Sequence, residues 1–143
     1  MKVKILTSTG LLFFLSILFF ANYFNYFDPL NLCYISIDNY TSKPPRGNRN
    51  TIRKAIKLLK QSDQETYQVL CKYVDTIQEG GCSKPDENGQ FDREPAPACY
   101  LRGSKTIFIW PDNSEYNSIV SKRAEMIKKY AYFSKNFWEN RQD

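Results

Sequence analysis

The sequence predicts an α+β protein: a single N-terminal transmembrane helix, then a small helix-rich domain with one or two short strands and two disulfides. Three observations carry this prediction. Residues 5–27 contain no charged side chain, apolar residues recur at helical spacing in later segments, and all four cysteines follow the uncharged run.

The uncharged run at 5–27 is long enough to cross the roughly 30 Å hydrocarbon core of a bilayer as a helix. Lys2 and Lys4 precede the run, and Asp28 is the first charge after it. Because a basic flank stays in the cytoplasm, we expect a signal-anchor of a single-pass cell-membrane protein. Residues 1–4 would be cytoplasmic, and everything after the run would lie outside.

A cleaved signal peptide is the alternative for the same run, since it also has a basic start and an apolar middle. A cleavage site needs small residues at its last and third-last positions, and ending at Ala21 places Phe19 third-last. The run then continues into aromatic residues that suit a membrane interface, namely Tyr23, Phe24, Tyr26 and Phe27. Both features favour a retained anchor, which would contact membrane lipid through this N-terminal helix.

About 115 residues follow the anchor, enough for one small domain. We divide them into a membrane-proximal segment and linker at 28–50 and an extracytoplasmic domain at 51–143. Within the first part, Cys33–Asp38 alternates between apolar and polar residues and predicts a strand. The prolines and glycine of Thr41–Asn50 predict the linker.

Two helices are expected at the start of the domain. Thr51–Gln61 has apolar residues on one face and basic residues on the rest. A second helix is expected to begin at Ser62, which forms a capping-box pattern with Glu65. Helical spacing continues to Ile77, and Gly80–Gly81 would end the helix.

The C-terminal part predicts a strand and a long helix. Thr106–Trp110 is β-branched and aromatic and is ended by Pro111. Asn113 or Ser114 can cap the final helix. Its core-facing stripe comprises Tyr116, Val120, Ala124, Ile127, Ala131, Ser134 and Trp138, while Lys122, Arg123, Lys128, Lys129 and Lys135 lie mostly off it.

The cysteines predict two disulfides rather than a metal site. Cys82 and Cys99 flank a loop rich in proline, glycine and acids, and closing it would stabilise the fold by ~3 kcal/mol. The pair Cys33–Cys71 then follows by elimination. A zinc site built from all four thiolates is the alternative, but the cysteines do not come as the close pairs that zinc sites use.

The chain contains no histidine, which removes Ser-His-Asp and Cys-His catalysis and the HExxH zinc protease motif. Adjacent Ser–Lys pairs occur at 104–105, 121–122 and 134–135, but neighbours on a helix do not face each other. Asp86 and Asn88 open a loop that resembles a calcium site in composition and departs from its register. We therefore assign no catalytic residue, no metal ligand and no cofactor.

The net charge of +5 does not predict a nucleic-acid partner, because basic and acidic residues are interleaved outside the anchor. A solvated surface is the simpler interpretation. Weak attraction to anionic lipid or to a cell-wall polyanion is the alternative. The expected macromolecular partner is an envelope or surface protein.

The stretch from Thr51 to Trp138 resembles small extracytoplasmic zincin-like metallopeptidase domains. The resemblance lies in the helix at 65–77, the strand at 105–110 and the helix beginning near Ser118. In such a family the last helix carries HExxH. Here Ser118–Glu125 reads SIVSKRAE, so the resemblance implies a degenerate, non-catalytic relative with no site residue carried over.

We therefore expect a membrane-anchored, non-enzymatic interaction domain that recognises its partner through the Cys82–Cys99 loop. The alternative is an envelope hydrolase or a degenerate metallopeptidase-like protein. An enzyme of this kind would need two carboxylates in a cleft, or a serine and a lysine within hydrogen-bond reach.

Overall fold

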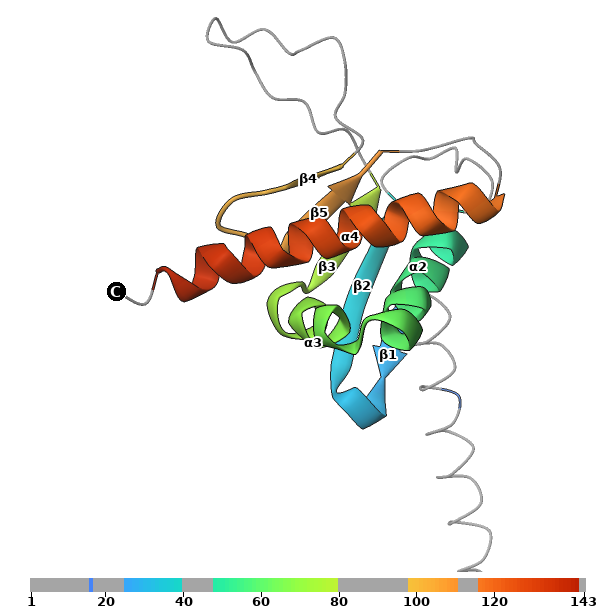
Figure 1. Ribbon diagram of the computed structural model, residues 1–143, viewed down its shortest axis with the longest axis horizontal. Helices are drawn as coiled ribbons and strands as arrows, with labels where there is room; N and C mark the ends of the chain where they lie inside the picture. The colour runs from blue at the N-terminus through green and yellow to red at the C-terminus, as the bar shows by residue number, and fades with distance from the viewer. Residues whose placement is uncertain (1–15, 17–24, 40–47, 80–97, 111–115, 142–143) are drawn as a thin grey trace, which may run out of the picture.

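The computed structural model describes residues 16, 25–39, 48–79, 98–110 and 116–141 (Figure 1). Within these residues the helices and strands are β1 (Tyr26–Asp28), the 3₁₀ helix η1 (Pro29–Asn31), β2 (Cys33–Asn39), α2 (Asn48–Ser62), α3 (Gln64–Tyr73), β3 (Thr76–Glu79), β4 (Ala98–Tyr100), β5 (Thr106–Ile109) and α4 (Tyr116–Glu139). The protein is α+β, as the sequence predicts.

The strands form one five-stranded sheet in the order β1-β2-β3-β5-β4. The three central strands β2, β3 and β5 are parallel, and β1 and β4 add antiparallel edges. Figure 1 shows α2, α3 and α4 on the same side of this sheet. The buried side chains that face them include five isoleucines, each at most 1% exposed: Ile35, Ile37, Ile77, Ile107 and Ile109. The core therefore lies between one sheet face and one layer of helices.

The five-stranded sheet corrects the expectation of one or two short strands. The strand expected within 28–50 is β2, which lies inside the sheet and belongs to the domain. The helix expected to continue to Ile77 instead ends at Tyr73, because Val74 has an extended backbone (φ −130°, ψ 120°). Ile77, the last residue of the predicted helical spacing, therefore lies in the strand β3.

The cap of α3 also differs from the prediction. Asp63, rather than Ser62, is the N-cap residue, and its carboxylate accepts a hydrogen bond from the Thr66 N–H at 3.0 Å. The Ser62 hydroxyl instead donates to the Leu58 carbonyl at the end of α2. The helix is therefore capped by the Asp63 carboxylate, one residue after the Ser62 at which the predicted capping box begins.

Among the described residues, no helix is both long and apolar enough to cross a bilayer. This finding contradicts the predicted transmembrane signal-anchor at 5–27 and the single-pass cell-membrane localisation. The described end of that run is a strand: Tyr26 is 4% exposed and faces the core, and neighbouring Phe27 points away from it. The aromatic pair that suggested a membrane interface thus follows the two-residue period of β1. The remainder of the run, apart from Ser16 and Asn25, lies outside the described residues.

One disulfide, Cys33–Cys71, has both cysteines in the described part of the chain, where two disulfides were expected. It joins the start of β2 to α3. Cys99 is also disulfide-bonded, but its expected partner Cys82 lies outside the described residues.

A buried ion pair joins α4 to the sheet. Glu79 on β3 and Arg123 on α4 are 0% and 1% exposed, and their charged groups lie 3.5 Å apart. Arg123 also donates a hydrogen bond to the Thr51 hydroxyl on α2. Arg123, which helical periodicity placed off the core stripe, is therefore a core residue that joins three elements.

Candidate functional site

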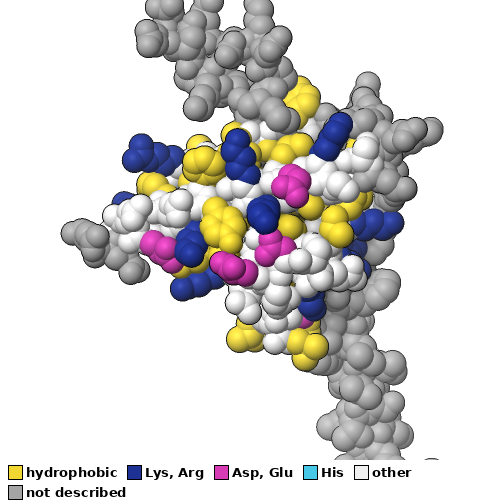
Figure 2. Space-filling view, in the orientation of Figure 1, with side chains coloured by type: hydrophobic (Ala, Val, Ile, Leu, Met, Phe, Trp, Pro, Cys, Tyr) yellow, Lys and Arg dark blue, Asp and Glu magenta, His cyan; other side chains and the backbone are white. Residues whose placement is uncertain are grey.

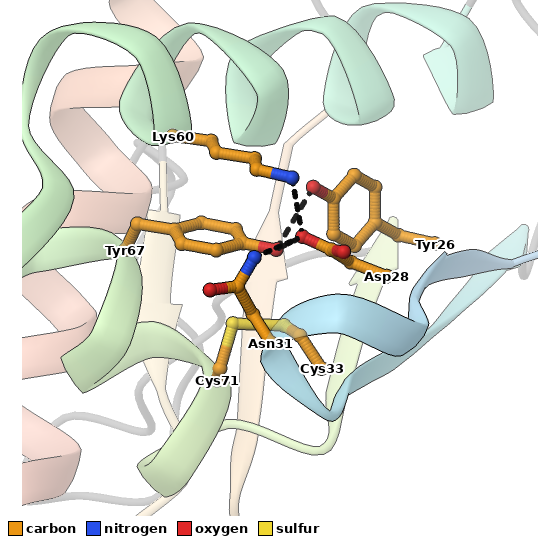
Figure 3. Close-up of a disulfide and its surroundings, with 7 residues drawn as sticks. All are labelled: Tyr26, Asp28, Asn31, Cys33, Lys60, Tyr67 and Cys71. Carbon is orange, nitrogen blue, oxygen red and sulfur yellow. Dashed lines mark hydrogen bonds and ion pairs between the residues drawn. A yellow bond between two sulfur atoms is a disulfide. The ribbon is translucent and has the colours of Figure 1, made fainter.

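The buried carboxylate of Asp28, at the end of β1, accepts hydrogen bonds from side chains of three neighbouring helices (Figure 3). Lys60 of α2 and Tyr67 of α3 each donate to one Asp28 carboxylate oxygen at 2.6 Å. The Asn31 amide of η1 donates to the same oxygen at 2.8 Å. The three donors come from three different elements, so the carboxylate holds these elements together.

Two further contacts tie the same elements. The hydroxyls of Tyr26 and Tyr67 lie 3.0 Å apart, and their rings meet edge to face. The Cys33–Cys71 disulfide lies beside this cluster (Figure 3). Cys33 is the cross-strand partner of Asp28. Polar cluster and disulfide therefore both brace the β1–β2 hairpin against α3.

The pKa values of Asp28, Lys60 and Tyr67 all lie far from neutral pH. Burial acts to raise the pKa of the Asp28 carboxyl, but hydrogen bonds from Lys60, Tyr67 and Asn31 outweigh it and hold the pKa well below its usual range. Burial and the neighbouring Asp28 carboxylate raise the pKa of the Tyr67 hydroxyl far above its usual value. The hydrogen bond to Asp28 also raises the pKa of Lys60. No member of this cluster is poised to exchange a proton near neutral pH, so the arrangement suits bracing rather than acid–base catalysis.

We predict that Asp28→Asn destabilises the protein by about 1.5–3 kcal/mol at neutral pH, because hydrogen bonds to a charged acceptor become hydrogen bonds to a neutral one. The loss should shrink in acid. An Asp28 pKa that is lower in the folded state stabilises the fold above the unfolded value, about 3.9, and this stabilisation is lost as the pH falls below it. Urea unfolding between neutral pH and about pH 3 measures both effects.

Asp63 supplies a reference within the same experiment. A hydrogen bond from Lys128, together with those from Thr66, lowers the pKa of Asp63 to about 2. Because Asp63 is present in both, the wild-type protein and Asp28→Asn should both lose stability in acid. Asp28→Asn should lose less. Equal pH dependence in the two proteins would show that Asp28 is not a stabilising acceptor.

The braced hairpin ends in an apolar tip, defined here as residues 29–32. Leu30 and Leu32 are 91% and 90% exposed. Leu32 has a left-handed backbone, with φ +49° and ψ +37°. It is the only described residue other than glycine with a positive φ. The Leu32 N–H donates to the Pro29 carbonyl, which closes the turn.

Two depressions border the hairpin tip. One has a volume of about 320 Å³, and its lining includes Leu32, Tyr67 and Cys71. The other has a volume of about 510 Å³ and lies between β1 and α2, where Lys57 and Gln61 contribute to its lining. Both are open to solvent and adjoin the braced tip.

The structure does not bring the other predicted candidates together as a site. The Cys82–Cys99 loop lies outside the described residues except at its end. Ser134 is buried and donates to the Tyr73 carbonyl, and Ser104 donates to the Leu101 carbonyl, so both hydroxyls serve the backbone. The described ranges contain no group of three side chains suited to hold a metal ion.

Sequence reasoning missed Asp28, Lys60 and Tyr67 as a unit. Asp28 was taken as the charge that ends a membrane span, and the other two residues lie on separate helices. No local pattern links the three, since Lys60 and Tyr67 follow Asp28 by 32 and 39 residues.

No protein-family model matches this chain, no curated protein matches its sequence, and no solved structure matches its fold. The zincin-like resemblance therefore stays a prediction. The function has to be argued from the residues themselves.

Proposed function

We propose that this protein is a non-enzymatic binding module that presents the hairpin tip to a partner protein. The observation that carries the proposal is Leu32, an exposed leucine with a left-handed backbone. Glycine or asparagine would adopt this conformation at lower cost. The cost of a leucine in this conformation is explained if its side chain contacts a partner rather than solvent.

The bracing beneath the tip supports the same proposal. A loop that is ordered before binding loses less conformational entropy when it binds. The tip is held by a disulfide on one side and by the Asp28 hydrogen bonds on the other. Two exposed leucines on such a support provide apolar area that an apolar partner surface can bury.

Partner capture tests the proposal. We would compare the wild-type chain, Leu30→Asn/Leu32→Asn and the control Trp110→Asn, using extracts of the cells that make the protein and quantitative mass spectrometry. Trp110 is a suitable control because it is also an exposed apolar residue, at 41%, and lies outside the hairpin. A partner captured by wild type and control should fall at least about tenfold with the double variant. Equal capture by all three proteins would refute the proposal.

We also predict that Leu32→Asn alone stabilises the protein by about 0.5–1 kcal/mol while weakening capture. Asparagine tolerates the left-handed region better than leucine, and no buried contact of an exposed side chain is lost. The urea midpoint measures this gain. A loss of stability would show that Leu32 contributes to the fold, and the argument from its backbone would fail.

A further inference from the structure

We propose that the C-terminal half of α4, together with the β4–β5 turn, forms a second binding surface that takes an acidic peptide segment of a partner protein. We call it the aromatic–basic surface. It combines three rings with three cations: Tyr130, Phe133, Phe137, Arg102, Lys129 and Arg141. It is distinct from the hairpin tip and goes beyond the function proposed above.

The rings follow one edge of the helix. Tyr130, Phe133 and Phe137 recur at helical spacing, beside the stripe that packs on the sheet. Tyr130 and Phe133 contact each other with ring centroids 5.6 Å apart. Phe137 contacts Tyr100 of β4 at 6.4 Å, which joins the helix to the edge of the sheet. Phe133 is 51% exposed, so an apolar side chain of a partner can reach it.

Each cation lies against one of these rings. Arg102 and Arg141 lie 5.7 and 5.8 Å from the Phe137 ring centre, and Lys129 lies 5.5 Å from that of Tyr130. Stacking on a ring leaves the edge of a guanidinium free to donate to a carboxylate. None of the ion pairs between described residues uses these three cations.

The acidic residues of α4 lie on the side that faces α2 and α3. Glu139 accepts a hydrogen bond from the Tyr73 hydroxyl of α3 at 2.7 Å. Glu125 borders a depression that Ser62 and Asp63 also line. Figure 2 shows hydrophobic and basic side chains over the face that carries α4, with acidic side chains among them. The aromatic–basic surface thus has positive charge without acidic side chains from α4, which complements an acidic ligand.

The geometry favours an acidic peptide over single-stranded nucleic acid. Bases bind by stacking on open aromatic faces. Here both arginines lie against Phe137, and Lys129 lies against Tyr130, so these rings are partly covered by cations. Carboxylates binding the cations, with one apolar residue against Phe133, use the surface without displacing these contacts.

The test uses the full chain and three probes. The first is a labelled peptide of about 12 residues in which Asp and Glu alternate with Leu and Phe. The second is the same peptide with Asn and Gln in place of the acids, and the third is an oligothymidine of similar length. Fluorescence anisotropy gives affinity, and amide chemical shifts give the location. Lys57→Glu is the matched charge control, because Lys57 is an exposed lysine on α2.

The acidic peptide should bind most tightly and shift amides at 100–104 and 129–141. Arg102→Glu and Arg141→Glu should each weaken it at least about tenfold, and Lys57→Glu, which changes the net charge by the same amount, less than about twofold. Affinity should also fall several-fold between about 50 and 300 mM salt. No binding, equal binding of the neutral peptide, tighter binding of oligothymidine, or shifts centred elsewhere would each overturn the proposal. The hairpin variant Leu30→Asn/Leu32→Asn should leave the affinity unchanged, which separates this surface from the proposed function.

Discussion

Replacing Glu79 with leucine should destabilise the protein by about 3–5 kcal/mol, because it leaves the Arg123 guanidinium buried without its carboxylate. The two residues lie on β3 and α4, so the substitution removes a contact between the sheet and α4. Equilibrium urea unfolding measures the loss. The Arg123 guanidinium keeps its hydrogen bond to the Thr51 hydroxyl, but a neutral acceptor does not replace the charge of the lost carboxylate.

A double-mutant cycle separates the ion pair from simple packing. Glu79→Leu/Arg123→Met removes both charges and fills the space with apolar groups. We expect it to be more stable than the sum of the single changes predicts, by about 1–3 kcal/mol. Additive losses would mean that the two side chains contribute independently, and that the pair does not hold α4 to the sheet.

Removing the disulfide with Cys33→Ser/Cys71→Ser should cost about 4 kcal/mol, since the two cysteines are 38 residues apart and the bond restricts the unfolded chain. The effect should extend to the hairpin tip, because Cys33 opens β2 directly after the tip. We therefore expect faster amide hydrogen exchange at residues 29–35 in the variant. Capture of the partner should weaken with it.

Asp28→Asn is the useful comparison for that experiment. It loosens the other side of the same hairpin and leaves the disulfide in place. If the disulfide variant unfolds at the wild-type urea concentration, the bond contributes no stability. If exchange at the tip stays at the wild-type rate in both variants, the tip is not braced as we describe.

Elements with strong local patterns could be predicted from the sequence. Apolar residues at helical spacing indicated α2 and α4, and β-branched residues indicated β5. The strands β1, β3 and β4 have three or four residues each and lack the β-branched and aromatic run that marks β5. Such short segments become strands through pairing with neighbours distant in the sequence, and no local period records that pairing.

The misread residues share a physical cause. Tyr26 and Phe27 suit a membrane interface and a half-buried strand equally well, because both environments favour aromatic side chains. Arg123 was placed mostly off the core-facing stripe by helical periodicity, and only the position of Glu79 in the fold reveals its partner. The candidate site was missed for the same reason, since Asp28 meets Lys60 and Tyr67 only in the fold.

Site-specific photo-crosslinking tests the central claim most directly. A photoreactive amino acid would replace Leu30 or Leu32 in the full chain, with position 122 on the exposed surface of α4 as the control. Irradiation in the cells that make the protein should yield one common protein adduct from positions 30 and 32 and none of that adduct from 122. No adduct from the tip, or the same adduct from all three positions, would contradict a braced hairpin that binds its partner through its apolar tip.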